Sequence, residues 1–380
     1  MSLRGFFQAQ AGRWVDPSLR AKFWRLLEEP ARLSFRTRLR SARLSAPTGA
    51  PVLNYGGALV GQGMVHGGRV KLIHLAERFP EAAGDFNLLY LVSSAPPRFG
   101  LELVEWARGN GVKFVLNQNG VAYPAWCGDR GEEINGPMRA LRQEADFIFH
   151  QSVFCKFCAD QFLGEVNAPG EIAFNCVDTA LFRPDRPPSG DACQLLVAGS
   201  HHESYRVLSA LETVAELRRR RFPVRLRLAG RLAWPNAEAE VREKIQALRI
   251  GDNVEIAAPY SQSEAPGIYR AAHILIHAKY KDPCPTVPIE AMACGVAVMG
   301  SRSGGMPELV SEAAGVLIEV PESWAENHWP TPRALADGVE TIMSRWPQFS
   351  ADARAHAVAR FSKTQWVAQH ARVFNSLLKR

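Results

Sequence analysis

The sequence has no apolar run long enough to cross a lipid bilayer. In its 380 residues, no uninterrupted apolar stretch approaches the roughly 20 residues that a membrane-spanning helix needs. The opening residues also lack the apolar segment and the small-residue cleavage site of a secretory signal. We therefore expect a cytoplasmic chain that spans no membrane.

Cysteine is scarce, and its spacing is irregular. The chain has seven cysteines, and among them only Cys155 and Cys158 form a C-x-x-C pair. A zinc site of this type needs a second such pair, which the sequence lacks. A redox pair is the alternative, but we favour small apolar side chains inside a helix. We expect all the cysteines to be reduced thiols.

Motifs for dinucleotides, for metals and for nucleic acids are also missing. No G-x-G-x-x-G follows a strand and opens a helix, which argues against a nicotinamide dehydrogenase, and there is no Asp-x-Asp motif. The net charge of +7 arises entirely in residues 1–50, where ten Lys and Arg face three acids, whereas the remainder has 35 of each. Because no nucleic-acid-binding signature accompanies this excess, we expect no nucleic-acid partner.

Residues 1–49 are predicted to form a basic helical extension. Asp16 followed by Pro17 is typical of a helix start. The apolar positions on one face are Leu19, Phe23, Leu26 and Leu27, and the basic positions are Arg20, Lys22, Arg25, Arg32, Arg36, Arg38, Arg40 and Arg43. Two interpretations stay open: a helix packed on the protein with solvated arginines, or peripheral contact of residues 1–47 with an anionic membrane surface.

From residue 51 onwards, apolar strands alternate with amphipathic helices, as in parallel sheets with helices on both faces. A first series has strands at 51–55, 86–92, 112–117, 146–150 and 171–175, and helices at about 67–79, 100–109, 137–144 and 152–162. A second series has strands at 194–199, 225–230, 254–258, 273–277, 296–300 and 315–320. The chain is therefore expected to be an α/β protein with two doubly wound sheets in succession.

A proline-rich stretch at 182–190 separates the two series and is predicted to be a linker. The expected domains are an extension (1–49), an N-terminal domain (50–188), a C-terminal domain (189–361) and a final amphipathic helix (362–380) that begins at Ser362. Ligands of such sheets bind at the carboxyl ends of the strands, so two sheets facing each other would form a cleft between them.

The most informative stretch runs from Tyr280 to Val298, between two apolar strands. Asp282 lies on a loop with prolines, and a short helix near Pro288 is expected to contain Glu290 in its first turn. Unpaired backbone amides at a helix N-terminus bind anions, and carboxylates beside them can accept hydrogen bonds from sugar hydroxyls. The alternative is that both acids only cap the helix.

Through Val310, this stretch resembles the signature of the family 4 retaining glycosyltransferases. That signature has an acid, seven residues and a Glu, then A-M-A-x-G and G-G-x-x-E, and the first acid, usually Glu, is Asp282 here. Weaker similarity at 145–152 and 172–184, where Cys176 replaces a usual glycine, extends the resemblance to about residues 50–375. It implies the GT-B architecture, two Rossmann-like doubly wound domains facing each other across a cleft.

The resemblance also implies roles for individual residues. Asp282 would contact the donor hexose and Glu290 the nucleoside ribose of a nucleoside-diphosphate sugar. The main chain that would contact sugar and diphosphate comprises Pro283, Cys284, Pro285, Thr286 and Val287. The family is typically metal-independent, so no metal or other cofactor is expected, and a basic pair stabilises the leaving diphosphate. Arg206 matches one residue of this basic pair, and the alternative is that Arg206 is only a solvated residue at the start of a helix. Ser200 replaces the other, so Arg231 or another cation would have to compensate.

In the N-terminal half, the resemblance points to a glycine-rich loop at Gly56 and Gly57, with Gly67-Gly68 as a rival position. Glycines let amides approach a diphosphate, although they also make turns. Asn119 stands near the position where relatives carry a His. A neutral amide is no base, but it can hydrogen-bond a sugar hydroxyl or orient the acceptor.

The expected function is retaining hexosyl transfer from a nucleoside-diphosphate sugar to a glycan, a lipid-linked or a small-molecule acceptor. Two alternatives remain: a catalytically silent nucleotide-sugar-binding relative or scaffold, supported by the substitutions at Ser200, Asn119 and Cys176, and a nucleotide-sugar epimerase of the same architecture.

Overall fold

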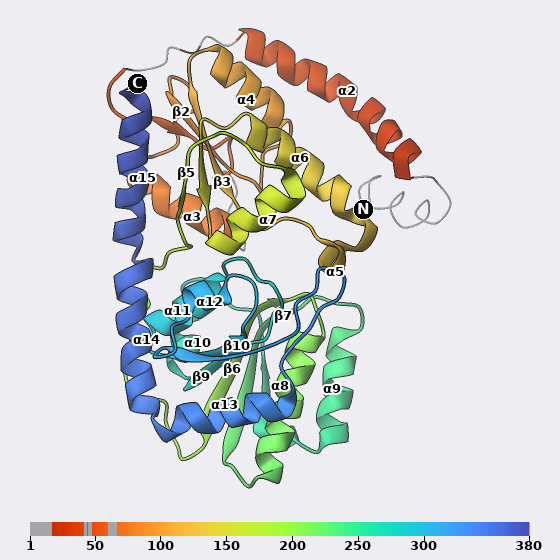
Figure 1. Ribbon diagram of the computed structural model, residues 1–380, viewed down its shortest axis with the longest axis vertical. Coiled ribbons are helices and arrows are strands. Elements are labelled where there is room, and N and C mark those ends of the chain that lie inside the picture. The colour runs from red at the N-terminus through yellow and green to blue at the C-terminus, as the bar shows by residue number, and fades with distance from the viewer. Residues whose placement is uncertain (1–16, 42–43, 45–47, 60–66, 380) are drawn as a thin grey trace.

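A computed structural model describes residues 17–41, 44, 48–59 and 67–379. The predicted cap Asp16, Arg43 and the side chains of residues 17–27 lie outside this description. Two parallel sheets, one of five and one of six strands, lie one above the other along the longest axis of the molecule (Figure 1). The α/β fold with two successive sheets, predicted from the alternating pattern, is confirmed.

The first sheet has its strands in chain order, β1-β2-β3-β4-β5. They are β1 (Leu53–Asn54), β2 (Leu88–Val92), β3 (Lys113–Gln118), β4 (Phe147–His150) and β5 (Gly170–Ile172). The helices are α3 (Gly67–Ala76), α4 (Gly100–Gly109), α5 (Pro124–Cys127), α6 (Gly131–Gln143) and α7 (Val153–Leu163), and the 3-10 turn η1 (Gly128–Arg130) precedes α6. Strand β2 is buried along its whole length, as expected for a parallel strand covered on both faces.

The helix predicted over 137–144 begins earlier, at Gly131. The predicted range begins at Pro137, and proline is typical of a helix start, but Pro137 lies in the interior of α6. Because proline has no N–H, the helix lacks the hydrogen bond to the carbonyl of Glu133 and continues without it. The helix predicted over 152–162 is α7, whose Ser152 accepts a hydrogen bond from the amide of Cys155.

The second sheet has the order β11-β10-β9-β6-β7-β8. Its strands are β6 (Cys193–His201), β7 (Val224–Leu232), β8 (Val254–Ala257), β9 (Ile274–His277), β10 (Ala297–Ser301) and β11 (Gly315–Ile318). Its helices are α8 (Tyr205–Arg219), α9 (Ala237–Leu248), α10 (Ala265–Arg270), α11 (Thr286–Ala293), α12 (Met306–Leu309), α13 (Pro332–Ser344) and α14 (Trp346–Phe361), with the 3-10 turn η2 (Gly251–Asn253) before β8. Helices α8, α9 and α13 cover one face, and α10, α11, α12 and α14 cover the other.

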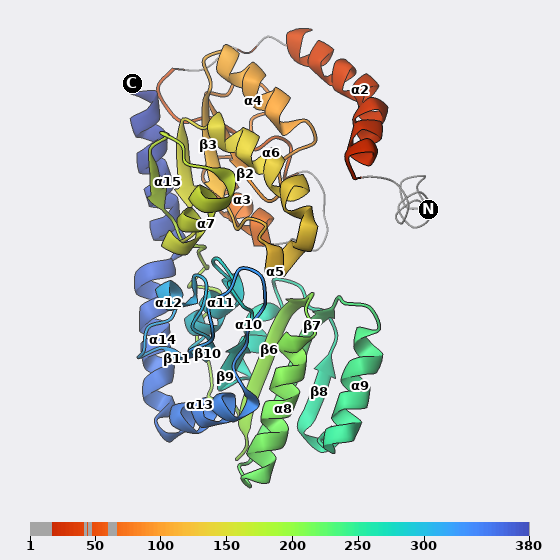
Figure 2. The ribbon, with the colours of Figure 1, turned by 45° about the vertical axis from the view of Figure 1, so that its right-hand side comes forward.

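The final helix, α15 (Lys363–Leu378), returns to the first sheet. Trp366, Phe374 and Leu377 are buried in the same core as strands β1 to β4 and helix α3, whereas α4 and α6 cover the opposite face. Figures 1 and 2 show α14 beside the second sheet and α15 beside the first. Ser362 does not cap α15 with its side chain. Its backbone pairs instead with Val177, where the chain crosses between the halves for the first time.

Helix α2 (Pro17–Ser41) lies on the outer side of the first sheet, beside α4 (Figures 1 and 2). The described part of this segment is therefore a helix packed on the protein, and contact of residues 1–47 with a membrane stays a prediction. No helix in the described ranges combines the length and the apolar character that a membrane span requires. Across those ranges all the cysteines are free and buried, with Cys155 and Cys158 inside α7.

Candidate functional site

The strand order of the second sheet reverses between β6 and β9. The chain leaves β6 through α8 towards β7 on one side, and it leaves β9 through α11 towards β10 on the other. Such a switch point leaves a crevice at the carboxyl ends of the two strands, where ligands of parallel sheets bind. Arg206 lies in the first turn of α8, and Lys279 and Asp282 follow β9. The fold thus brings Asp282 and Arg206 to one crevice.

Asp282 is buried and remains ionised. Its Oδ2 lies 3.2 Å from Nε2 of His277 and 3.3 Å from the ammonium of Lys279. Burial acts to raise the pKa of Asp282, but the Lys279 charge and the His277 hydrogen bond outweigh it, and the pKa lies well below its usual range. Because burial lowers the pKa of His277, that ring is neutral and donates its Nε2 proton to the carboxylate.

The cations expected to stabilise a leaving anion gather at the same edge. The guanidinium of Arg206 is buried, and its Nη1 donates to the carbonyl oxygen of Ser200 at 3.0 Å. The interpretation of Arg206 as a solvated residue is therefore wrong. Arg231 lies on β7 as the register partner of Ser200, and it lowers the pKa of His202 together with burial and Lys279. Lys279 was missed in the sequence because no motif marks it.

Glu290 lies in the second turn of α11, not in its first turn as predicted, because the helix begins at Thr286. Its carboxylate accepts hydrogen bonds from Tyr269 Oη at 2.7 Å and from Gln262 Nε2 at 2.8 Å. Burial raises the pKa of Glu290, and these two donors oppose the rise. Neither Glu290 nor Asp282 caps α11, whose N-terminus has no side-chain cap. The alternative of two capping acids is therefore wrong.

The segment from Pro283 to Val287 leads from Asp282 into α11. Pro285 is the N-cap, and the first backbone amides of a helix have no partner within it, so those of Thr286 and Val287 remain available to an anion. A Cβ built on Gly199, at the end of β6, would lie 3.3 Å from Cγ2 of Val287. The start of α11 therefore lies against the carboxyl end of β6.

The glycines of the G-G-x-x-E segment allow a close backbone approach behind Asp282. A Cβ built on Gly305 would lie 2.0 Å from the carbonyl oxygen of Pro283, and one on Gly304 would lie 2.7 Å from that of Asp282. The amide of Gly305 donates to the Asp282 carbonyl at 2.8 Å. No other residue fits at these two positions without displacing the loop that carries Asp282.

In the first sheet, Gly56 and Gly57 both have positive φ, 70° and 76°, and follow β1. Their amides are already bound: Asn54 Oδ1 accepts from Gly56 at 2.8 Å, and Glu81 Oε1 accepts from Gly57 at 2.8 Å. These glycines therefore build a turn that binds a carboxylate of the protein itself. The rival pair, Gly67-Gly68, forms the first residues of α3.

Asn119 lies at the carboxyl end of β3, where it accepts a hydrogen bond from a buried lysine. The ammonium of Lys71, from α3, donates to Asn119 Oδ1 at 3.0 Å and to Asn117 Oδ1 at 2.9 Å. Within the described ranges no carboxylate pairs with Lys71. Burial lowers its pKa to about 8. Sequence reasoning missed Lys71 because it lies 48 residues from Asn119 and carries no motif.

The carboxyl edges of the two sheets face each other. Ser152 Oγ donates to the carbonyl of Pro283 at 2.7 Å, and a Cβ built on Gly120 would lie 2.7 Å from Pro283 Cγ. Asn175 Nδ2 donates to the carbonyl of Cys284 at 2.6 Å. The Asp282 loop therefore lies directly under the strand ends that carry Asn119.

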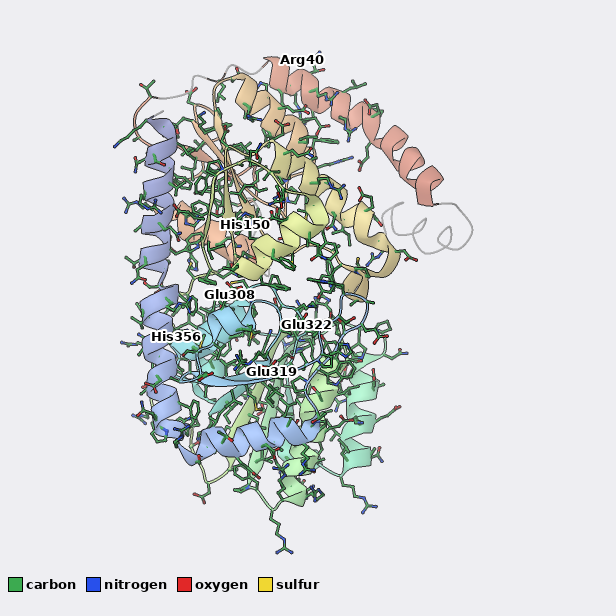
Figure 3. All side chains as sticks on the ribbon, in the orientation of Figure 1. Arg40, His150, Glu308, Glu319, Glu322 and His356 are labelled. Carbon is green, nitrogen blue, oxygen red and sulfur yellow. The ribbon has the colours of Figure 1, made fainter. Side chains whose placement is uncertain are left out.

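Glu308, the acid of G-G-x-x-E, also crosses between the halves. Its two carboxylate oxygens accept the amides of Val153 at 2.7 Å and Phe154 at 2.8 Å, at the N-terminus of α7. Figure 3 shows Glu308 at the boundary of the two halves, below His150 of β4. Among the residues that the structure describes, no three His, Cys, Asp or Glu side chains converge on a common metal position.

Comparison with known sequences finds similarity in the C-terminal half. Residues 180–346 match the family described as Glycosyl transferases group 1. The chain is 30% identical over 121 residues to a D-inositol 3-phosphate glycosyltransferase of Segniliparus rotundus. That match covers 31% of this chain and 26% of the relative. It is 28% identical over 161 residues to the lipopolysaccharide core biosynthesis mannosyltransferase LpsB of Rhizobium meliloti. That match covers 40% of this chain and 42% of LpsB. The matches thus span less than half of either relative.

Solved structures extend the similarity to most of the chain. HepE of Anabaena, in a complex with UDP-glucose, superposes with a TM-score of 0.67 at 15% identity, covering 86% of this chain and 99% of that one. A sucrose-phosphate synthase of Thermosynechococcus elongatus gives a TM-score of 0.65 at 16% identity, covering 78% and 75%. At such identities the likeness shows the fold, and the fold expected from the resemblance, GT-B with two Rossmann-like domains, is confirmed.

Proposed function

We propose that this chain, whose residues 180–346 match Glycosyl transferases group 1, is a retaining family 4 glycosyltransferase that moves a hexose from a nucleoside-diphosphate sugar to a hydroxyl group. The observation that supports this most is the crevice between β6 and β9. There the ionised Asp282 lies between Lys279 and His277, beside the open N-terminus of α11. A nucleotide sugar needs both features, because its hydroxyls donate hydrogen bonds and its diphosphate accepts them.

The proposed division of labour follows from this geometry. Asp282 accepts hydrogen bonds from the hexose hydroxyls, and Glu290 accepts those of the ribose once Gln262 and Tyr269 yield to the ligand. Charge develops on the departing diphosphate in the transition state, so preorganised cations and amides stabilise that state more than the ground state. Arg206, Lys279, Arg231 and the first amides of α11 supply them, and the reaction requires no metal.

In this proposal no protein nucleophile takes part, so retention requires that the acceptor hydroxyl attack from the side on which the diphosphate leaves. The departing phosphate then takes the acceptor proton, so no protein base is needed at Asn119. The C–O bond to the diphosphate breaks as the new glycosidic C–O bond forms on the same face of the sugar. Holding both substrates in this arrangement contributes most of the rate enhancement.

A thermal-shift screen of the purified chain against UDP, GDP, ADP, TDP and their sugar conjugates tests the donor site. Because a structure of HepE contains UDP-glucose, we expect the uridine series to raise the melting temperature. Glu290→Ala should abolish that rise, whereas Glu312→Ala, an exposed acid, should keep it. If no nucleotide stabilises the wild type, the proposal of a nucleotide-sugar enzyme is wrong.

The stereochemistry and the metal requirement need a turnover assay. With the stabilising donor and a panel of glycan, lipid and small-molecule acceptors, the anomeric proton of the product should show the configuration of the donor, and EDTA should not lower the rate. An inverted product would refute retention. An altered donor sugar without an acceptor would favour the epimerase.

A silent nucleotide-sugar-binding relative is the second candidate, and one observation favours it. The carboxylate of Glu81 accepts the hydrogen bond of the Gly57 amide at 2.8 Å, so that N–H is not available to a diphosphate. Donor binding without transfer to any acceptor would support the silent relative. Rescue of transfer by Glu81→Ala, which removes the acceptor and frees the Gly57 amide, would show instead that the turn only has to open.

A further inference from the structure

A cavity of about 560 Å³ lies between α2 and the carboxyl end of β1. Its apolar wall includes Phe35 and Leu39 of α2 and Phe99 and Leu103 at the start of α4. The turn at Gly56, which follows β1, forms part of its floor. This volume is within the range of pockets that hold a small organic molecule. The cavity is separate from the crevice at Asp282.

Helix α2 is attached firmly enough to form a defined wall. Arg32 pairs with the buried Glu102 of α4 at 2.8 Å, and the rings of Phe35 and Phe99 lie 5.5 Å apart, centroid to centroid. The guanidinium of Arg98 lies over the same Phe99 ring at 4.9 Å. An ion pair to a buried carboxylate and an aromatic contact together hold the helix against α4.

The charged part of the lining is cationic. Arg38 and Arg98 both line the cavity, and none of its lining residues is an Asp or a Glu. Arg98 has a carboxylate neighbour, Glu28, at 3.6 Å. Arg38 is exposed, and among the described residues no carboxylate lies within 4.0 Å of it. Its side chain packs over the ring of Phe35 at 5.8 Å, so a guanidinium meets the apolar wall directly.

We propose that this cavity binds an anionic amphiphile, a lipid phosphate. The phosphate pairs with Arg38 and Arg98, and the hydrocarbon chain lies along Phe35, Leu39 and Phe99.

Calorimetric titration of the full chain with dihexanoyl phosphatidic acid, kept below its micelle concentration, tests the site. We expect saturable binding, and Arg38→Glu and Leu39→Trp should each weaken it by about 10-fold or more, through lost charge pairing and through filling of the cavity. The matched control is Arg40→Glu, which makes the same charge change on an exposed residue of α2 outside the cavity lining (Figure 3). It should leave the affinity unchanged.

Two further ligands separate the sources of binding. Inorganic phosphate alone and dihexanoyl phosphatidylcholine, whose head group has no net charge, should both bind at least about 10-fold more weakly than phosphatidic acid. If phosphate alone binds as tightly, the apolar wall contributes nothing and the proposal is overturned. If Arg38→Glu and Arg40→Glu weaken binding equally, the lipid meets a general basic surface rather than the cavity, which also overturns it.

The response to UDP distinguishes this inference from the proposed function. Arg38→Glu and Leu39→Trp lie outside the donor crevice, so both variants should keep the thermal shift caused by UDP, which also shows that they are folded. Lipid binding without a response to UDP, GDP, ADP, TDP or their sugar conjugates would refute the glycosyltransferase and leave only the lipid site. A UDP response without lipid binding would refute the lipid site alone.

Discussion

The carboxyl edges of the two sheets differ in what holds their polar groups. In the second sheet, Asp282 comes five residues after the end of β9, and its carboxylate is held by His277 and Lys279 from the same short segment. In the first sheet, Asn119 is held by Lys71 of α3, and Gly57 by Glu81, which comes 24 residues later. The carboxylate of Asp282 is therefore held by neighbours in the sequence, whereas Asn119 and Gly57 are held by residues 48 and 24 positions away.

This difference explains why the family match is confined to residues 180–346 while the fold extends further. A backbone that approaches within van der Waals contact, as at Gly305, tolerates few side chains, so the same residue types recur at fixed spacing. A site assembled from separate elements can be built in many ways, so it leaves no short pattern. Changes on the two sides should accordingly have different consequences.

The largest effect is expected on the donor side. Asp282→Asn removes a charge that Lys279 and His277 hold in place, and it puts an amide group where hydroxyl donors are expected. We expect kcat/KM for the best donor and acceptor to fall by at least about 100-fold, as for other preorganised polar groups in active sites. Steady-state kinetics on the folded variant measure this loss.

The control for Asp282→Asn is Asp252→Asn, which changes an exposed acid in η2 of the same domain. It should leave kcat/KM unchanged. If Asp282→Asn kept more than about one third of the activity, a factor worth well under 1 kcal/mol, the crevice between β6 and β9 would not be the donor site.

On the first sheet, the expected effect comes from Lys71. Lys71→Met removes the cation that holds Asn119, and we expect kcat to fall by roughly 10-fold to 100-fold. Because burial lowers the pKa of Lys71 to about 8, the activity of the wild type should decline as the pH rises through that value, whereas the variant should lack this decline. Lys156→Met, which alters an exposed lysine, is the control.

Stability gives a second readout for the same residue. The folded pKa of Lys71 lies below the unfolded value of 10.5, so between about pH 8 and 10.5 the unfolded chain binds more protons. Wild-type stability should therefore rise with pH in this window, by up to about 3 kcal/mol. The difference between the unfolding free energies of wild type and Lys71→Met should change by that amount. A pH-independent difference would mean that Lys71 is not a buried cation.

Much of the donor side could be predicted from the sequence. Asp282 and Arg206 meet in one crevice as the resemblance implies, and the strands of both sheets are close to their predicted ranges. The errors have local causes, since Glu290 lies one turn further into α11 because the helix starts at Thr286. Lys71, Lys279 and the return of α15 to the first sheet could not be predicted, because each depends on contacts between distant segments.

The smallest expected effect joins the two sides. Glu308 belongs to the sequence signature of the donor half, yet its carboxylate accepts two amides at the N-terminus of α7 in the other half. In Glu308→Gln, one of the two acceptor oxygens becomes an NH₂ group that faces an N–H, and the charge that favours a helix N-terminus is lost. We expect a loss of about 1 kcal/mol in stability, seen as a melting temperature lower by about 2–4 °C.

Glu312→Gln, an exposed acid four residues later, should leave the melting temperature unchanged. The UDP-induced shift should persist in Glu308→Gln, because the carboxylate contacts α7 and not the crevice. Equal melting temperatures for the two variants would show that the contact with α7 contributes nothing to stability. A lost UDP response with unchanged stability would place Glu308 in the donor site itself. The donor site would then include a residue whose carboxylate contacts α7 of the other half in the structure.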